Sequence, residues 1–417
     1  MTETLTKLPH PVSQPNLRHL RALLMVAEAK SITAAADRIH LSQPAITQAV
    51  KKLERHFGAP LFERQKAGMY LTAAGRLLCD RARRALAHVS DAAREAMRET
   101  KGRRNHADQL MTTAQLQALI AVSEQGSFAL AARATGLAQP TLHRAARDLE
   151  RNLGAALFER TSYGVKPTRA ANRFADRAQL AFSELDQARA EIAAHGGREA
   201  GTTVIGALPL ARNDLVPKAV SRFSLDHPGH RIVITEGPYE NLPLGLRRGE
   251  IDVLVGALRK NLPAPDVIQE ALFDDPLSII MRPGHPLARA RKITRKRLAE
   301  FPWVAPRPDA PLRGQFEALF APAGIERPVD IIECNALSAS RVLLMESDRL
   351  MLLSDAQTHY EREAGMLISK PHPDGRIARE IGLTMRRDWR PTVVQAKLVD
   401  LLRRQARGSR RRGRHAG

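Results

Sequence analysis

Residues 17–72 carry an apolar pattern that predicts two short helices, a third helix and a hairpin. Within 17–30 the apolar side chains recur at helical intervals, at Leu20, Leu23, Leu24 and Ala27. Ser31 is suited to cap a second short helix that holds Ala34, Ala35 and Ile39. Its small side chains would let two helices cross closely.

A third helix is expected over residues 43–57. Ser42 is a suitable N-cap, Pro44 lies in the first turn, where its missing N–H costs nothing, and Gly58 ends the helix. One face is apolar, with Ile46, Ala49, Val50 and Leu53. The opposite face is short, polar and cationic, with Thr47, Gln48, Lys51, Lys52 and Arg55.

The stretch "PLFERQKAGMYLT" then predicts a short β-hairpin with Gly68 at its turn. This order of elements is that of a winged helix-turn-helix, whose third helix enters the major groove of DNA. A helical hairpin with a solvated charged face is the alternative.

The whole pattern occurs twice. Ser31 aligns with Ser127, and the same offset of 96 residues aligns Gln43 with Gln139. No gap is needed from Leu17 to Thr72. Two copies at so long a period indicate a domain duplication and not a solenoid.

The second copy keeps the inner face of the third helix and changes the outer one. The inner residues are Leu142, Ala145, Ala146 and Leu149, and the outer ones are His143, Arg144, Arg147, Asp148 and Arg151. Ala138 replaces Ser42, so the capping hydroxyl is lost. Asp148 replaces Lys52 and would repel a phosphate. We expect this copy to fold and hypothesise that it contacts a different DNA sequence; a spacer or a dimer surface is the alternative.

The stretch "LLMVAEAKSITAAADRIHLSQPAITQAVKKLERHFGAPLFERQKAGMYLTAAG" closely resembles the N-terminal domain of LysR-type transcriptional regulators. The resemblance implies DNA contacts by Ser42, Gln43, Pro44, Thr47, Gln48 and Lys51, and places Arg64 at the wing. The other candidate DNA-binding residues are Thr33, Lys52 and Arg55 of the first copy and Gln139, Pro140, Thr141, His143, Arg144, Arg147 and Arg160 of the second.

Each copy is followed by an Ala-rich helical stretch with heptad spacing. The first seam holds Leu78, Ala82, Ala85, Val89, Ala92 and Ala96, and the second holds Phe174, Ala178, Ala181, Leu185, Ala188 and Ile192. In LysR-type proteins the helix after the DNA-binding domain builds the dimer. The second seam is bulkier, so we expect residues 169–195 to form the dimerising helix. The alternative is that the two seams of one chain pair with each other.

In the C-terminal half, strand-like and helix-like stretches alternate from residue 202 to residue 354, which predicts a parallel α/β sheet. Two such lobes would form a cleft at the carboxyl ends of their strands. The pieces "GEIDVLVGAL" and "MRPGHPLA" resemble the effector domain of LysR-type regulators, which is like a periplasmic binding protein. The branch that contains galactose-binding-protein and protocatechuate-pathway regulators is the most similar.

Candidate effector-binding residues follow from their position after predicted strands or at a helix start: Pro209, Leu210, Ala211, Arg212, Tyr239, Asn335 and Ser338. Family members often carry Ser or Thr where this chain has Leu210 and Ala211. Arg212 is suited to hold an anionic effector, and a surface arginine is the alternative.

Composition fits these expectations. The chain has 417 residues and a formal net charge of +21, which favours a polyanionic partner. Its two cysteines form neither a disulfide framework nor a zinc site. It shows no long apolar run, no signal core and no nucleophile–base cluster, so we expect a cytoplasmic protein that is neither a solute carrier nor an enzyme.

The expected fold class is α/β plus α, with tandem winged helix-turn-helix domains ahead of a two-lobed effector domain. The expected segments are a disordered N-terminus (1–15), a winged domain (16–75), a linker helix (76–100), a flexible joint (101–111), a second winged domain (112–168), a second linker helix (169–195), an effector domain (201–402) and a disordered basic tail (403–417).

The expected partners are double-stranded DNA, a small-molecule effector and further copies of the chain in a homodimer or homotetramer, with no cofactor. The expected function is that of an effector-gated transcriptional regulator. An architectural DNA-binding protein with a ligand-blind C-terminal domain is the alternative.

Overall fold

The structure is a computed structural model that describes residues 13–100, 107–162, 164–208, 211, 213–237, 241–259, 264–308, 310, 312–322 and 325–412. The chain divides into two compact units. The first unit comprises the described residues of Met1–Gly206, Ser224–Val253 and Arg386–Lys397. The second comprises those of Ala207–Phe223, Leu254–Met385 and Leu398–Gly417.

The first unit begins with a winged helix-turn-helix domain. Its elements are α1 (Leu17–Ala29), α2 (Ile32–Ile39), α3 (Gln43–Phe57), β1 (Phe62–Gln65) and β2 (Gly68–Leu71). The predicted caps are confirmed, because the hydroxyls of Ser31 and Ser42 accept hydrogen bonds from the N–H groups of Ala34 and Ala45. Gly58 ends α3 in the left-handed conformation that glycine tolerates best.

The second copy folds in the same order. Its elements are α5 (Thr113–Gln125), α6 (Phe128–Thr135), α7 (Gln139–Leu153), β3 (Phe158–Thr161) and β4 (Gly164–Pro167). As the sequence predicts, α7 lacks a side-chain cap at Ala138. A short 3₁₀ helix, η1 (Ala107–Leu110), precedes this domain. Met111 beyond it is fully buried and Asp108 accepts a hydrogen bond from Arg21, so the described part of the predicted joint is packed against the first domain.

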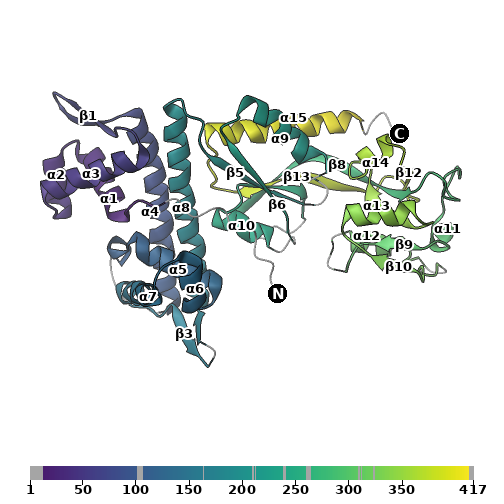
Figure 1. Cartoon of the computed structure of the whole chain (residues 1–417), viewed down its shortest axis with the longest axis horizontal. Helices are drawn as coiled ribbons and strands as arrows, with labels where there is room; N and C mark the ends of the chain where they lie inside the picture. Colours follow the sequence, from purple (N-terminus) through teal and green to yellow (C-terminus); the bar gives the residue numbers. More distant parts are fainter. Residues whose placement is uncertain are drawn as a thin grey trace. The chain divides into compact units, whose positions relative to one another are not determined.

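Two long helices, α4 (Ala73–Thr100) and α8 (Arg169–His195), follow the two winged domains and lie side by side (Figure 1). They are antiparallel, because Arg81 near the start of α4 pairs with Glu191 near the end of α8, while Glu95 pairs with Arg173. The expectation that residues 169–195 form an intermolecular dimer helix is therefore corrected. The seam of α8 is covered by α4 of the same chain, which is the alternative that the heptad pattern left open.

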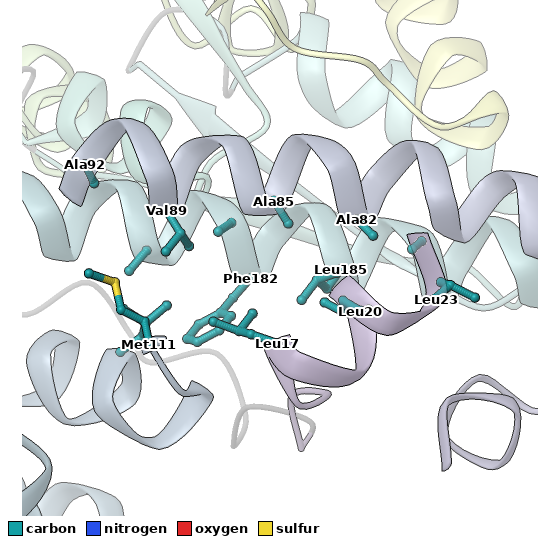
Figure 2. Close-up of a cluster of buried hydrophobic side chains, with 14 of the residues drawn as sticks. Leu17, Leu20, Leu23, Ala82, Ala85, Val89, Ala92, Met111, Phe182 and Leu185 are labelled. Atoms are coloured by element: carbon teal, nitrogen blue, oxygen red, sulfur yellow. The ribbon is translucent and has the colours of Figure 1, made fainter. Parts of the chain in front are cut away.

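One apolar core runs through both copies and both long helices. Figure 2 shows side chains of α1, α4 and α8 converging on it, together with Met111. Among them are Leu17 and Leu20 of α1, Ala85 and Val89 of α4, and Phe182 and Leu185 of α8. Because this core is continuous, the two winged domains are held together by packing and not only by the chain that connects them.

The rest of the first unit holds two parallel strands, β5 (Thr202–Ala207) and β6 (Arg231–Thr235), and α10 (Leu242–Arg248). Helix α10 packs on α8, where Arg248 donates to Asp176 over 2.6 Å. The segment Arg386–Lys397 also belongs to this unit and contacts α4.

In the second unit the strand order is β10-β9-β11-β8-β13-β7, with β12 paired to β8. These strands are β7 (Val253–Ala257), β8 (Val267–Met281), β9 (Trp303–Ala305), β10 (Ile331–Glu333), β11 (Leu350–Ser354), β12 (Ile368–Pro371) and β13 (Ala378–Arg386). The remaining helices of the chain are α9 (Leu215–Asp226), α11 (Arg295–Ala299), α12 (Arg313–Ala318), α13 (Leu337–Met345), α14 (His359–Glu363) and α15 (Val393–Arg412).

Two expectations for this half need correction. The sheet is mixed and not parallel throughout, because the long strand β8 runs antiparallel to β11, and β13 antiparallel to β7. The predicted disordered tail is helical as far as Arg412, since Leu402 and Ala406 are buried at helical spacing and Arg403 pairs with Glu270. Residues 413–417 of the tail lie outside the described residues, as do residues 1–12 of the N-terminus.

Candidate DNA interface and effector region

Helix α3 presents its polar face to solvent. Gln48, Lys51, Lys52 and Arg55 are exposed, while the apolar face packs into the shared core. Thr47 is half-buried, and its hydroxyl donates to the carbonyl of Gln43 over 2.9 Å. The first copy therefore offers one amide and three cations on a rigid helix.

Helix α7 presents a different exposed face. Arg144 and Arg147 are exposed, and neither forms an ion pair within the part of the chain that the structure describes. Asp148 pairs with Arg151 on the same helix, which neutralises both. The ring of His143 is half-buried and stacks on Phe128 of α6, with ring centroids 3.8 Å apart.

The two wings are antiparallel hairpins. Arg64 is exposed on β1, where it lies opposite Met69. Arg160 occupies the matching place on β3, opposite Val165, and its side chain lies outside the described residues. The remaining candidate DNA-binding residues are exposed: Thr33, Ser42, Gln43, Pro44, Gln139, Pro140 and Thr141.

The pair of long helices contains a buried polar cluster that we call the Arg81 cluster: Arg81, Arg84, Glu184, Gln187 and Glu191. Arg81 donates to Glu184 over 2.8 Å and to Glu191 over 2.6 Å, and its side chain is only 6% exposed. Arg84 holds the second oxygen of Glu184 at 2.8 Å. Every charge in the cluster has an opposite partner, which a buried ion needs.

Hydrogen bonding decides the charge states in this cluster. Burial alone would raise the pKa of Glu184, but hydrogen bonds from Arg84 and Arg81 outweigh it and leave that pKa below its ordinary value. Burial alone would lower the pKa of Arg81, but hydrogen bonds to Glu191 and Glu184 leave it raised. Both groups are therefore charged at neutral pH.

The cluster also reaches the segment that follows β13. Arg81 donates to the carbonyl of Arg390 over 2.9 Å, and Arg84 donates to that of Asp388 over 2.6 Å. Arg386, the last residue of β13, donates to the carbonyls of Leu246 and Ile251. These hydrogen bonds, all within the first unit, connect α4 to the segment after β13, and the end of β13 to α10.

The Arg81 cluster is not among the sites predicted from the sequence. A signal was present, because Arg81 and Glu95 recur 96 residues later as Arg177 and Glu191, beside the apolar seams. Charged residues kept in both copies next to a buried seam indicate a polar contact between the two helices.

Three of the proposed effector-binding residues are described. Ala211 is fully buried in the second unit. Asn335 is exposed, and its side-chain oxygen accepts from the N–H of Arg307 at 3.1 Å. Ser338 is exposed in the first turn of α13. Pro209, Leu210, Arg212 and Tyr239 lie outside the described residues.

Near Ala211, the structure shows a buried polar group that the sequence did not predict. Asn213 donates to the carbonyl of Gln357, whose side-chain oxygen accepts from Arg379 at 3.0 Å. Arg379 also pairs with Asp275, and burial raises the pKa of Asp275 to about 6. This group ties the loop after β5 to β8 and β13 within the second unit.

Profiles of known families match most of the chain. The profile described as "Bacterial regulatory helix-turn-helix protein, lysR family" matches twice, at residues 17–76 and 113–172. The profile described as "LysR substrate binding domain" matches residues 196–407. No helix among the described residues is both long and apolar enough to cross a membrane.

Curated relatives carry similar descriptions. The chain is 35% identical over 375 residues to the HTH-type transcriptional regulator GalR of Pseudomonas putida, a match that covers 90% of this chain and 93% of that one. It is 27% identical to the regulator PcaQ of Agrobacterium fabrum, over 72% of this chain and 96% of that one. Among solved structures, the full-length regulator LysG of Corynebacterium glutamicum with bound effector Arg is 19% identical, with a TM-score of 0.51 over 70% of this chain and 97% of that one.

Proposed function

This chain belongs to the LysR family of bacterial regulatory helix-turn-helix proteins, and we propose that it contacts DNA through both of its winged domains. It is a DNA-binding transcriptional regulator with an effector-binding C-terminal domain. The comparisons give no support to a ligand-blind architectural protein.

One observation carries the proposal for two DNA contacts. Helices α3 and α7 both expose cationic side chains, while their apolar faces are buried. The apolar face of α3 packs into the shared core, and that of α7 packs partly there, through Leu149 and Leu153, and partly into a core of the second copy that holds Leu142 and Ala146. Exposed Lys and Arg side chains on a packed helix are suited to contact phosphates. Arg144 and Arg147 meet this requirement in the second copy, as Lys51 and Lys52 do in the first.

The test is the salt dependence of DNA affinity. Each phosphate contact contributes about 0.9 to the slope of log affinity against log salt. Arg144→Ala with Arg147→Ala should therefore lower that slope by roughly 1 if Arg144 contacts a base edge, and by roughly 2 if both arginines contact phosphates. Lys51→Ala with Lys52→Ala should lower it by a similar amount. The matched control is Arg83→Ala with Arg94→Ala, which removes the same charge from exposed positions on α4.

An unchanged slope for the variant with Arg144 and Arg147 replaced would contradict the proposal. It would support the alternative, in which the second copy is a spacer or a dimer surface. Thermal unfolding of each variant checks that the domain is folded.

For the C-terminal domain we propose a small-molecule effector that is bound near Ala211, Asn335 and Ser338. Arg212, which lies outside the described residues, is the proposed partner of an anionic group on this effector. Thermal unfolding of the full chain in a panel of small carboxylates tests this, since a ligand that binds the native state raises the unfolding temperature. Arg212→Ala should abolish the shift. If the wild-type chain shows no shift with any carboxylate, the anionic effector is rejected.

We further propose that the chain acts in the cytoplasm, where DNA is accessible, as a homodimer or homotetramer. Equilibrium sedimentation of the full chain tests the oligomeric state. A monomer at micromolar concentration would contradict it.

A further inference from the structure

The two winged domains of this chain are related by a local two-fold axis. Thr113 lies 96 positions after Leu17 and is its equivalent in the second copy. The two residues touch, because the N–H of Leu17 donates to the hydroxyl of Thr113 over 3.3 Å. In a two-fold arrangement, equivalent residues meet each other only at the axis.

The long helices show the same symmetry. Arg81 pairs with Glu184 at 2.8 Å. Exchanging the two copies turns this pair into Arg177 and His88, and the charge of Arg177 does act on His88. Contacts between helices are reciprocal too, since α3 touches α8 and α4 touches α7. The pairing resembles an isologous dimer interface, with both halves supplied by one chain.

Two-fold symmetry has a direct consequence for DNA. Helix-turn-helix dimers bind inverted half-sites because the symmetry of the protein is matched by that of the operator. Here the two recognition helices are not identical, so the protein does not require two identical half-sites. We propose that one chain binds an inverted pair of unlike half-sites, the first through α3 and the second through α7.

The exposed side chains indicate how the half-sites differ. Gln48 and Arg144 occupy equivalent positions and are both exposed. A glutamine amide matches the N6 and N7 edge of adenine, and an arginine guanidinium matches the O6 and N7 edge of guanine. The half-site of α3 therefore takes adenine at the position where the half-site of α7 takes guanine.

This inference rests on the proposed DNA contact by both copies. Selection of bound duplexes from a randomised pool, with the full chain, gives the preferred site. We expect two inverted, unlike half-sites. Gln48→Arg should change adenine to guanine in one half-site only, and Arg144→Gln should change guanine to adenine in the other. A palindromic or directly repeated site would overturn the inference.

Four designed duplexes then measure the preference: the selected site, each half-site duplicated as a palindrome, and the two half-sites as a direct repeat. The selected site should bind about 5- to 150-fold more tightly than the others, the range expected for one mismatched bidentate contact. Equal binding of either palindrome would overturn the inference, because it would mean that the same helix from two chains occupies both halves.

A mixing experiment tests whether one chain supplies both helices. A chain with Gln48→Ala and Lys51→Ala is co-expressed with a chain with Arg144→Ala and Arg147→Ala. Mixed oligomers should bind the selected site as weakly as either variant alone. Restored wild-type affinity would overturn the inference, since the two half-sites would then be bound by different chains.

The proposed DNA contact by the second copy and the inference of unlike half-sites can fail separately. If Arg144→Ala with Arg147→Ala changes neither the affinity nor the salt slope, the proposed function of the second copy fails, and this inference fails with it. If that variant weakens binding but the selected site is a palindrome, the second copy does bind DNA and only this inference fails.

Discussion

In the first winged domain the third helix is capped by Ser42 and exposes Gln48, Lys51 and Lys52. In the second, the cap is absent, Arg144 and Arg147 are exposed, and Asp148, which replaces Lys52, is half-buried and paired with Arg151. The buried residues of the two helices remain alike, with Leu53 matched by Leu149 and both fully packed. Packing tolerates little change in volume, whereas an exposed polar face tolerates many substitutions. The comparison therefore separates the residues that fold each domain from the exposed residues that we propose to contact DNA.

The largest expected effect comes from breaking the contact between the two copies. Arg81→Ala would leave Glu191 buried without its partner, and Glu184 with Arg84 alone. Loss of one partner from a buried ion pair costs about 3–5 kcal/mol. Urea unfolding should show this loss in the free energy of unfolding of the first unit. It is followed by the fluorescence of Trp389, which lies in that unit, in a chain whose other tryptophan is replaced by Trp303→Phe.

The control for this prediction is Arg83→Ala, which removes an exposed arginine from the same helix. It should change the free energy of unfolding by less than about 0.5 kcal/mol. Equal effects of the two substitutions would mean that the Arg81 cluster does not hold the copies together.

A smaller effect is expected at Gly75, where the copies differ in backbone packing. A Cβ at Gly75 would lie 2.1 Å from the carbonyl oxygen of Leu61, whereas the second copy accommodates Ala171 at the equivalent position. Gly75→Ala should destabilise the first copy by about 1–3 kcal/mol through overpacking. Ala171→Gly should cost about 1–2 kcal/mol, through helix propensity and the loss of a buried methyl group. If thermal unfolding shows no loss of stability for Gly75→Ala, the two copies do not differ in backbone packing at this position.

The cap should contribute about 1 kcal/mol or less. Ser42→Ala removes the hydroxyl that accepts from Ala45, and Ala138→Ser supplies one to the second copy. The first substitution should lower the unfolding temperature, and the second should raise it. If Ala138→Ser has no effect, the N-terminus of α7 does not have the capping geometry of α3.

The smallest expected effect is a pH dependence at His88, which occupies the position equivalent to Glu184. Burial lowers the pKa of His88, and the charge of Arg177 adds to this, against the opposing effect of Asp388. The native state therefore binds fewer protons than the unfolded state, so stability falls as the pH drops below the ordinary histidine pKa of about 6.5. In His88→Gln the unfolding temperature should change less between pH 5 and pH 7 than in the wild-type chain. The control is His195→Gln, at an exposed histidine, which should keep the wild-type pH dependence.

Local features of the winged domains were predictable from the sequence because they depend on neighbouring residues. Ser31 and Ser42 as caps, Gly58 as a helix end and the alternating faces of α3 follow from short-range rules. The prediction of a disordered tail was wrong because the tail is ordered by contacts with residues far away in the sequence. Leu402 is buried, and Arg403 pairs with Glu270.

The pairing of α4 with α8 could not be decided from the sequence. An apolar seam such as the one through Ala85 and Leu185 indicates that a helix is covered, but it does not indicate whether the cover is in the same chain. The packed segment around Met111 and the contact of Leu17 with Thr113 favour pairing within the chain, and neither is a property of the seams. For the same reason the Arg81 cluster emerged only from the structure.

The central claim, that the two copies pair within one chain, is tested most directly by a cross-link between α4 and α8. Glu95 and Arg173 form an ion pair at 2.6 Å, and both are partly exposed. Glu95→Cys and Arg173→Cys are introduced into a chain with Cys79→Ala and Cys334→Ser and joined with a short bismaleimide. Denaturing electrophoresis and peptide mass analysis should show an internal link in a product of single-chain mass. A product of twice that mass, or a link between mixed chains that carry one cysteine each, would contradict the claim.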